Sequence, residues 1–259
     1  MSERIVNDEI ALFSSLGEIY AKENIFVFDT LDSTNTYAKK FARENSSDAI
    51  FIAHHQTAGR GRMGRSFHSA KGKGLFLSLL TYCGLGGNDA TRLTTLTAVA
   101  VARAIESVCP INAKIKWVND IYVDVKKLAG ILVEGQMSVN GELDYAVIGI
   151  GVNLLEQDYP CEISAIATSI EECCGTRVEP IDLAVKIVRE IYTLLKCPFD
   201  KKIMIEYKNR SMLIGKTVTV LNNGGYTATV LDITDDARLV VESEHGTEEL
   251  FTGDVSIRL

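Results

Sequence analysis

Compact runs of apolar residues, separated by polar or glycine-containing segments, recur along the first 150 residues of the chain. Apolar runs of about four to eight residues are typical of strands that are buried within a sheet. The runs predict strands at 25–28, 49–53, 75–80, 114–117, 121–123, 127–134 and 143–150. Turn residues lie between several of them, and they predict turns at 84–88, at 118–120 and, as a hairpin, at Asn140–Gly141.

Segments with apolar residues at helical spacing lie before, between and after these strands. Such spacing places the apolar side chains on one face of a helix. It predicts helices at 7–20, 37–42, 89–108, 164–173, 180–195 and 199–210. Residues 32–35 offer N-cap side chains for the second helix, Asp182 lies near the start of the fifth, and Pro110 follows the third. The expected fold class is α+β, with a mixed sheet flanked by helices.

The pattern changes near Met212, where β-branched residues and closely spaced turns replace the helical periodicity. Turns at 222–225, 235–236, 244–246 and 253–254 leave room for five short strands. Short strands at roughly ten-residue spacing indicate a small antiparallel barrel of the SH3 kind. We therefore expect a larger domain at 1–211 and an SH3-like domain at 212–259. A piece this small has too little core to be robust alone and should pack against the larger domain.

Composition and charge narrow the class of protein. The net charge of −7 argues against a protein that coats DNA through charge alone. No apolar run approaches the roughly 20 residues of a membrane span, and the N-terminus lacks the basic-then-apolar order of a signal peptide. These features predict a cytoplasmic protein without a membrane partner. The cysteines, which lack Cys-x-x-Cys spacing, are expected to be buried reduced thiols; they are Cys83, Cys109, Cys161, Cys173, Cys174 and Cys197.

One segment, 56–74, is basic within this acidic chain. It contains three arginines, two lysines, five glycines and no acidic residue. Glycine lets the backbone approach a ligand closely, and guanidinium groups are planar donors that match phosphate and carboxylate. The segment therefore predicts a loop that binds a polyanion, above all phosphate. The alternative is a solvated basic loop without a ligand.

Polar residues interrupt or follow several of the predicted strands. Such side chains are costly to bury without partners, so together they indicate a concave site with directed polar groups. Each also has a simpler explanation, such as a helix cap, a hairpin turn or an exposed strand end. They are Ser33, Thr34, Asn35, Gln56, the segment 116–120, Lys127 and Asn153.

Four motifs resemble those of biotin protein ligases and occur in the same order. They are Gly-Arg-Gly-Arg-x-Gly-Arg at 59–65, Lys-Trp-x-Asn-Asp at 116–120, Lys-Leu-Ala-Gly-Ile-Leu-x-Glu at 127–134 and Gly-Ile-Gly-Val-Asn at 149–153. The similarity extends from about residue 25 to the end, including Gly-Asp-Val-Ser at 253–256. It implies a catalytic domain like that of class II synthetases, with ATP and Mg²⁺ as cofactors and biotin as substrate. It also implies formation of biotinyl-5′-AMP, followed by transfer of biotin to a lysine of a biotin carboxyl carrier protein.

The resemblance assigns roles to individual residues. Lys127 and Arg62 would be catalytic, Asp120 would guide the carrier lysine, and no protein ligand is assigned to the metal. The ureido ring of biotin has two N–H donors and one carbonyl acceptor, which hydroxyl and amide side chains can satisfy. The residues expected at biotin are Ser33, Thr34, Asn35, Gln56, Arg60, Gly61, Arg62 and Lys127. The residues expected at ATP are Arg60, Arg62, Arg65, Trp117, Asn119, Lys127 and Asn153.

The chain departs from the family pattern in three places. Val118 replaces a common proline, and Phe67 replaces a tryptophan. No helix-turn-helix sequence precedes Ile25, so the resemblance favours a monofunctional ligase without direct DNA binding over a bifunctional ligase/repressor. A homodimer paired through sheet edges is possible by analogy. The alternatives are a lipoate protein ligase, whose loop usually has fewer arginines, and a non-catalytic biotin sensor.

Overall fold

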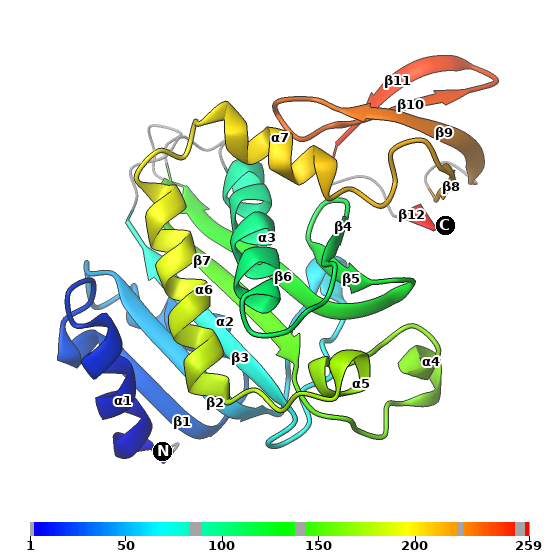
Figure 1. Cartoon of the computed structure of the whole chain (residues 1–259). Coiled ribbons are helices and arrows are strands. Elements are labelled where there is room, and N and C mark those ends of the chain that lie inside the picture. Colours follow the sequence, from blue (N-terminus) through cyan, green and yellow to red (C-terminus); the bar gives the residue numbers. More distant parts are fainter. Residues whose placement is uncertain (1–2, 83–89, 138–142, 222–224, 252–256, 259) are drawn as a thin grey trace.

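The computed structural model describes residues 3–82, 90–137, 143–221, 225–251 and 257–258, whose strands form two sheets (Figure 1). The larger sheet has the spatial order β1-β2-β3-β7-β6-β5-β4. Strands β1 and β2 pair in parallel, and the other neighbours pair antiparallel. Its strands are β1 (Ile25–Leu31), β2 (Ala49–Gln56), β3 (Gly74–Thr81), β4 (Lys114–Lys116), β5 (Asp120–Val123), β6 (Lys126–Met137) and β7 (Leu143–Asn153). The fold class predicted from the sequence is confirmed.

Helices cover the two faces of this sheet unequally. One face packs against α1, α3 and α6, whereas α2 lies on the other face, over β2, β3 and β7 (Figure 1). The helices are α1 (Val6–Leu16), α2 (Thr34–Phe41), α3 (Ala90–Glu106), α4 (Cys161–Ser164), α5 (Ile170–Cys174), α6 (Pro180–Leu195) and α7 (Lys201–Asn209). Because α2 is short, it leaves part of its face of the sheet uncovered by a helix.

Strand β2 shows how the apolar runs serve both faces. Ile50 and Ile52 belong to the large core under α1, α3 and α6. Phe51, between them, belongs to a smaller core together with Ala38 of α2. Successive side chains of a strand point to opposite faces, so a strand covered on both sides is apolar throughout.

The five-stranded sheet near the C-terminus is antiparallel and has the order β11-β10-β9-β8-β12. It forms the small SH3-like unit that the turn spacing predicts. Its strands are β8 (Thr217–Val220), β9 (Tyr226–Ile233), β10 (Leu239–Ser243), β11 (Gly246–Leu250) and β12 (Ile257–Arg258). The connection between β9 and β10 contacts the larger unit: the Trp117 indole N–H donates to the Ala237 carbonyl at 2.8 Å. The domain boundary at 211/212 stays a prediction.

The prediction of one helix at 164–173 is wrong. Helix α4 ends at Ser164 and α5 begins at Ile170, because the chain between them pairs with the start of β6. The Lys127 amide donates to the Ile166 carbonyl at 2.6 Å, and the Thr168 amide donates to the Lys127 carbonyl at 3.0 Å. These tertiary hydrogen bonds replace the helical ones, and the Ser169 side chain caps α5.

The cysteine prediction is also wrong in part. Cys109 and Cys174 form a disulfide, and Cys161 and Cys197 are exposed. Cys109 follows α3 and Cys174 ends α5, so packing brings together two positions whose sequence spacing gives no sign of contact.

The cap predictions are not met either, since neither α2 nor α6 has a side-chain cap hydrogen bond. The predicted turns at 84–88 and Asn140–Gly141, the turn residues 222–224 and 253–254, and Cys83 lie outside the described residues. No helix in the described part of the chain is long and apolar enough to cross a membrane.

Candidate active site

Three glycines of β6 and β7 form the floor of a cavity beside α2. Gly130 pairs with Gly151, and Leu132 pairs with Gly149 in the next inter-strand position on the same face. A methyl group at Gly149 would overlap the Asn35 side-chain amide, and one at Gly151 would lie 2.6 Å from the Phe67 ring. Glycine is therefore required here for close approach of the cavity walls.

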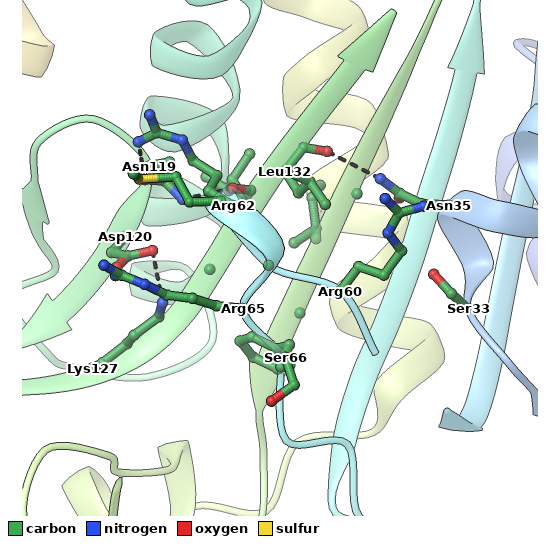
Figure 2. Close-up of a pocket in the computed structure, with 18 of the residues that line it drawn as sticks. Ser33, Asn35, Arg60, Arg62, Arg65, Ser66, Asn119, Asp120, Lys127 and Leu132 are labelled. Atoms are coloured by element: carbon green, nitrogen blue, oxygen red, sulfur yellow. Dashed lines mark hydrogen bonds and ion pairs between the residues drawn. The ribbon is translucent and has the colours of Figure 1, made fainter. Parts of the chain in front are cut away.

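The cavity above this floor brings together all the predicted site residues except Asn153 (Figure 2). Its volume is about 160 Å³. Figure 2 shows Arg62 with Asn119 at one end, Asp120 with Lys127 below them, and Asn35 with Ser33 on the α2 side. The predicted residues that line it are Ser33, Thr34, Asn35, Gln56, Arg60, Gly61, Arg62, Arg65, Trp117, Asn119, Asp120 and Lys127.

The basic loop lies over the cavity as a narrow turn. The Gly61 amide donates to the Arg65 carbonyl at 2.7 Å, and Arg60 forms an isolated antiparallel bridge with Ser66. Met63, at the tip, has a positive φ of 54° and is exposed. This turn directs the basic side chains that flank the tip, Arg62 and Arg65, to the cavity.

Arg62 is held by Asn119. Its guanidinium donates to the Asn119 side-chain oxygen at 3.0 Å, and the Asn119 amide nitrogen donates to the Ile131 carbonyl at 2.8 Å. Burial lowers the pKa of Arg62 from its ordinary value, and the nearby Asp120 charge opposes that shift. A guanidinium remains charged even so, which leaves a partly desolvated cation at one end of the cavity.

Lys127 and Asp120 form an ion pair at the same end, with 2.8 Å between the ammonium nitrogen and a carboxylate oxygen. The two side chains are 30% and 23% exposed, so the pair is accessible to a ligand but shielded on several sides. The ammonium also lies 5.9 Å from the centroid of the Phe67 ring. Phe67 thus forms an apolar wall of the cavity that borders both the glycine floor and the lysine.

Hydroxyl and amide groups line the α2 end of the cavity. The Gln56 side-chain oxygen accepts hydrogen bonds from the Thr34 amide at 2.9 Å and from the Thr34 hydroxyl at 3.2 Å. The Ser78 hydroxyl lies 2.6 Å from the Asn35 side-chain oxygen and 2.7 Å from the Thr34 hydroxyl. These contacts fix the rotamers of the polar groups before any ligand binds, which preorganises the site.

Glu134 anchors the cations and the amide of this end. Its carboxylate accepts from the Asn35 amide nitrogen at 2.9 Å and from the Lys39 ammonium at 2.8 Å, and it lies 3.4 Å from the Arg60 guanidinium. Burial alone would raise the pKa of Glu134, but the hydrogen bonds from Lys39 and Asn35 and the nearby positive charges lower it overall. Glu134 is therefore ionised and keeps Arg60 close to the cavity.

Asn153 is the exception among the predicted residues. Its amide nitrogen donates to the Thr168 carbonyl at 2.9 Å, and it does not line the cavity. Asn153 thus holds the segment that pairs with Lys127. Its predicted contact with ATP stays a prediction. Trp117 does line the cavity, although its indole N–H points to Ala237.

Sequence reasoning gave no role to several residues that shape the site. In the sequence, Phe67 is marked only by standing in place of a tryptophan, and Glu134 only by ending the motif at 127–134. Ser78 interrupts the apolar run 75–80, and a polar residue within such a run is the sequence signal for it; in the structure it is fully buried.

The two halves of the basic segment differ in their anchoring. The Lys73 carbonyl accepts from the amides of Leu154 at 2.9 Å and Leu155 at 3.1 Å, and the Gly72 amide donates to the His54 carbonyl at 3.1 Å. Residues 60–66 have fewer contacts of this kind and include exposed side chains at the tip. The later half is thus tied to the sheet by backbone hydrogen bonds, while the turn that carries Arg62 is tied through side chains, including Arg60 to Glu134 and Arg62 to Asn119.

Comparison with known proteins adds a family to this geometry. Residues 27–153 match the biotin/lipoate A/B protein ligase family, and residues 213–258 match the biotin protein ligase C-terminal domain. The Bifunctional ligase/repressor BirA of Bacillus subtilis is 31% identical over 250 residues, which cover 91% of this chain and 74% of that protein. The Biotin–[acetyl-CoA-carboxylase] ligase of Mycobacterium tuberculosis is 29% identical over 80% of this chain and 77% of its own length.

A solved structure gives the same result. The biotin protein ligase from Aquifex aeolicus in complex with biotin and ATP superposes with a TM-score of 0.78 and 26% sequence identity. The match covers 91% of this chain and 99% of the other. The similarity therefore extends over most of this chain.

Proposed function

Because this chain belongs to the biotin/lipoate A/B protein ligase family, we propose that its cavity carries the two-step reaction of a biotin–protein ligase. The chain is an ATP-dependent enzyme that attaches biotin to a protein, as its curated and structural relatives do. In the first step the biotin carboxylate attacks the α-phosphate of ATP, which gives biotinyl-5′-AMP and pyrophosphate. In the second step the amine of a carrier lysine attacks the acyl carbon, and AMP leaves.

The first step brings a carboxylate to a triphosphate, so it needs positive charge in a site with little water. Arg62 and Lys127 supply this charge from two directions, because Asn119 holds the one and Asp120 pairs with the other. Lys127 would shift from Asp120 to the reacting oxygens as negative charge builds at the α-phosphate. Arg60 and Arg65 flank the entrance and would bind the outer phosphates and the biotin carboxylate.

Biotin would lie over the glycine floor with its ureido ring at the α2 end. Thr34, Asn35 and Gln56 offer hydroxyl and amide groups there, and Ser33 lies beside them. A ureido group needs two acceptors and one donor, which this set provides. The apolar part of biotin would contact Phe67 and Leu132, which also line the cavity.

Mg²⁺ would be held mainly by the phosphates of ATP. Within the described residues no three His, Cys, Asp or Glu side chains gather into a metal site, and Asp120 is the only carboxylate among the residues that line the cavity. Mg²⁺ fits this arrangement because it commonly keeps several waters and takes one or two carboxylates plus phosphate oxygens. When bound, it neutralises phosphate charge.

The transfer step requires that the carrier amine reach the acyl carbon beside Lys127. Asp120 lies at this end of the cavity and would orient the incoming ammonium and accept its hydrogen bond. The partner is the biotin carboxyl carrier domain of a biotin-dependent carboxylase; the mycobacterial relative is named as a ligase for acetyl-CoA-carboxylase.

The observation that carries this assignment is the convergence of Arg62 and Lys127 on one cavity in a chain of this family. The test is biotin-dependent exchange of labelled pyrophosphate into ATP, followed by transfer of labelled biotin to a purified carrier domain. Lipoate with a lipoyl carrier domain serves as the parallel substrate. Exchange that depends on lipoate and not on biotin would overturn the proposal, and binding of biotin without any exchange would favour a sensor.

A further inference from the structure

The cavity segment 117–120 is held from outside the seven-stranded sheet. Two residues before it, the Ile115 amide donates to the Arg210 carbonyl at 2.8 Å, and the Met212 amide donates to the Ile115 carbonyl at 3.0 Å. The Trp117 indole N–H donates to the Ala237 carbonyl, in the connection between β9 and β10 of the small C-terminal unit. These contacts hold the residues that lead to Asn119 and Asp120. The peptide between Val118 and Asn119 is held by a different contact.

Tyr207 of α7 makes that contact. Its hydroxyl donates to the Val118 carbonyl at 2.9 Å, and the tyrosine side chain is fully buried. Burial raises the pKa of Tyr207; the negative charge of Asp120 adds to this shift, and the positive charge of Arg62 opposes it. The phenol therefore stays protonated as a donor, and it lies close enough to both active-site charges to sense them.

Helix α7 is itself fixed to α3. The Glu206 carboxylate, next to Tyr207 in sequence, accepts from the Arg103 guanidinium at 3.1 Å and from Arg210 at 2.9 Å. Arg210 also donates to Glu106 at 2.8 Å. The tyrosine hydroxyl is thus presented to the cavity segment from a rigid support.

We propose that Tyr207 is a positioning residue for the adenylation step, acting through Val118 on Asn119 and Asp120. These two residues hold Arg62 and Lys127, at 3.0 Å and 2.8 Å respectively. Tyr207 does not line the cavity and would not touch either substrate. Its hydroxyl fixes the orientation of the 118–119 peptide, and that orientation determines the positions of the Arg62 and Lys127 side chains.

Loss of the hydroxyl would leave the buried Val118 carbonyl without its donor, which is an unfavourable state. The peptide would rotate to find another partner and would move Asn119 and Asp120 with it. The biotin end is held separately, by the hydrogen bond from the Thr34 amide to Gln56 and by that from the Asn35 side-chain amide to Glu134. Turnover should therefore fall while biotin affinity is retained.

The test is Tyr207→Phe in the full chain, measured by biotin-dependent pyrophosphate exchange and normalised to biotin-binding sites. Misplacement of reacting groups by about 1 Å can cost about 100-fold in rate, so we expect kcat to fall by about 10- to 100-fold. The biotin Kd should change by less than about twofold, because the contacts at that end remain. Tyr82→Phe is the matched control, since its hydroxyl also donates to a backbone carbonyl, that of Asn45 at 2.6 Å, away from the cavity.

A second variant separates positioning from a general loss of structure. If Tyr207 acts through Asn119, Tyr207→Phe should reduce the rate little further in an Asn119→Ala background, whereas independent effects would multiply. A normal rate in the single variant, an equal fall with Tyr82→Phe, or full multiplication in the double variant would overturn the inference. The inference rests on the proposed function, and that function fails separately if the unmodified chain shows no biotin-dependent exchange.

Discussion

Replacement of Lys127 by alanine is the most direct test of the catalytic assignment. Lys127 is the lysine of β6 that lines the cavity, whereas its neighbour Lys126 is exposed to solvent. Two unit charges about 4 Å apart interact by about 4 kcal/mol at the effective dielectric of a protein surface. Because Lys127 is already paired with Asp120 before the reaction, part of this attraction is offset when it turns to the substrate.

We therefore expect Lys127→Ala to raise the barrier to adenylation by about 2–4 kcal/mol, which corresponds to a rate loss of about 30- to 1000-fold. Biotin should still bind, with reduced affinity, because the hydroxyl and amide groups at the α2 end are unchanged. The assay is pyrophosphate exchange at saturating ATP, with biotin binding measured by calorimetry. Lys126→Ala is the matched control, because it removes the adjacent lysine from the same strand without touching the cavity.

Two outcomes would refute this reasoning. Normal exchange by Lys127→Ala would show that the lysine does not stabilise the transition state. Equal loss of exchange with Lys126→Ala would show that general positive charge at this strand, and not a directed contact, supports the reaction.

Three further predictions concern the C-terminal unit, the basic loop and the biotin end. Deletion of 212–259 removes the Ala237 carbonyl, which holds the cavity residue Trp117. The deletion should therefore impair ATP use more than biotin binding. Equal losses in both would mean that the truncated chain unfolds. The segment 60–73 should be cut by protease without ligand and protected by biotin with ATP, and Arg62→Gly should release the adenylate early; unchanged cleavage and release would contradict a closing lid. The lowered pKa of Glu134 means that its ionised form contributes stability above the ordinary carboxyl range, which is lost as the pH falls through the folded-state pKa. Glu134→Gln should thus lower the free energy of unfolding at pH 7 by about 1–3 kcal/mol, measured by denaturant titration. In acid, the variant and the unmodified chain should have the same free energy of unfolding.

The strands and the main helices could be predicted because their apolar periodicity is local and strong. Helix α6 begins and ends at the predicted residues, Pro180 and Leu195. The failures have tertiary causes. The segment between α4 and α5 is extended because it pairs with Lys127, a residue far away in sequence. A helical pattern in the sequence carries no information about such a competing partner.

The candidate site was predictable mainly through its motifs. The sequence placed Arg62, Asn119, Asp120 and Lys127 in one site, and the structure brings them together. It could not show that Glu134 holds Arg60 and Lys39, because that contact depends on the position of α2 over the sheet. Phe67 was not predictable for the same reason, since its role depends on its contact with the glycine floor.

The glycine floor has a consequence for enzymes engineered to attach enlarged biotin analogues. Glycine is already the smallest residue, so no substitution at Gly130, Gly149 or Gly151 can deepen the slot, and each added methyl group would meet a wall. Extra room for a bulkier label must therefore come from the sides. Phe67 and Leu132 are the large apolar side chains that border the floor, and smaller residues at these two positions would widen the slot. Selection for analogue acceptance should concentrate its changes there and leave the strand glycines unaltered.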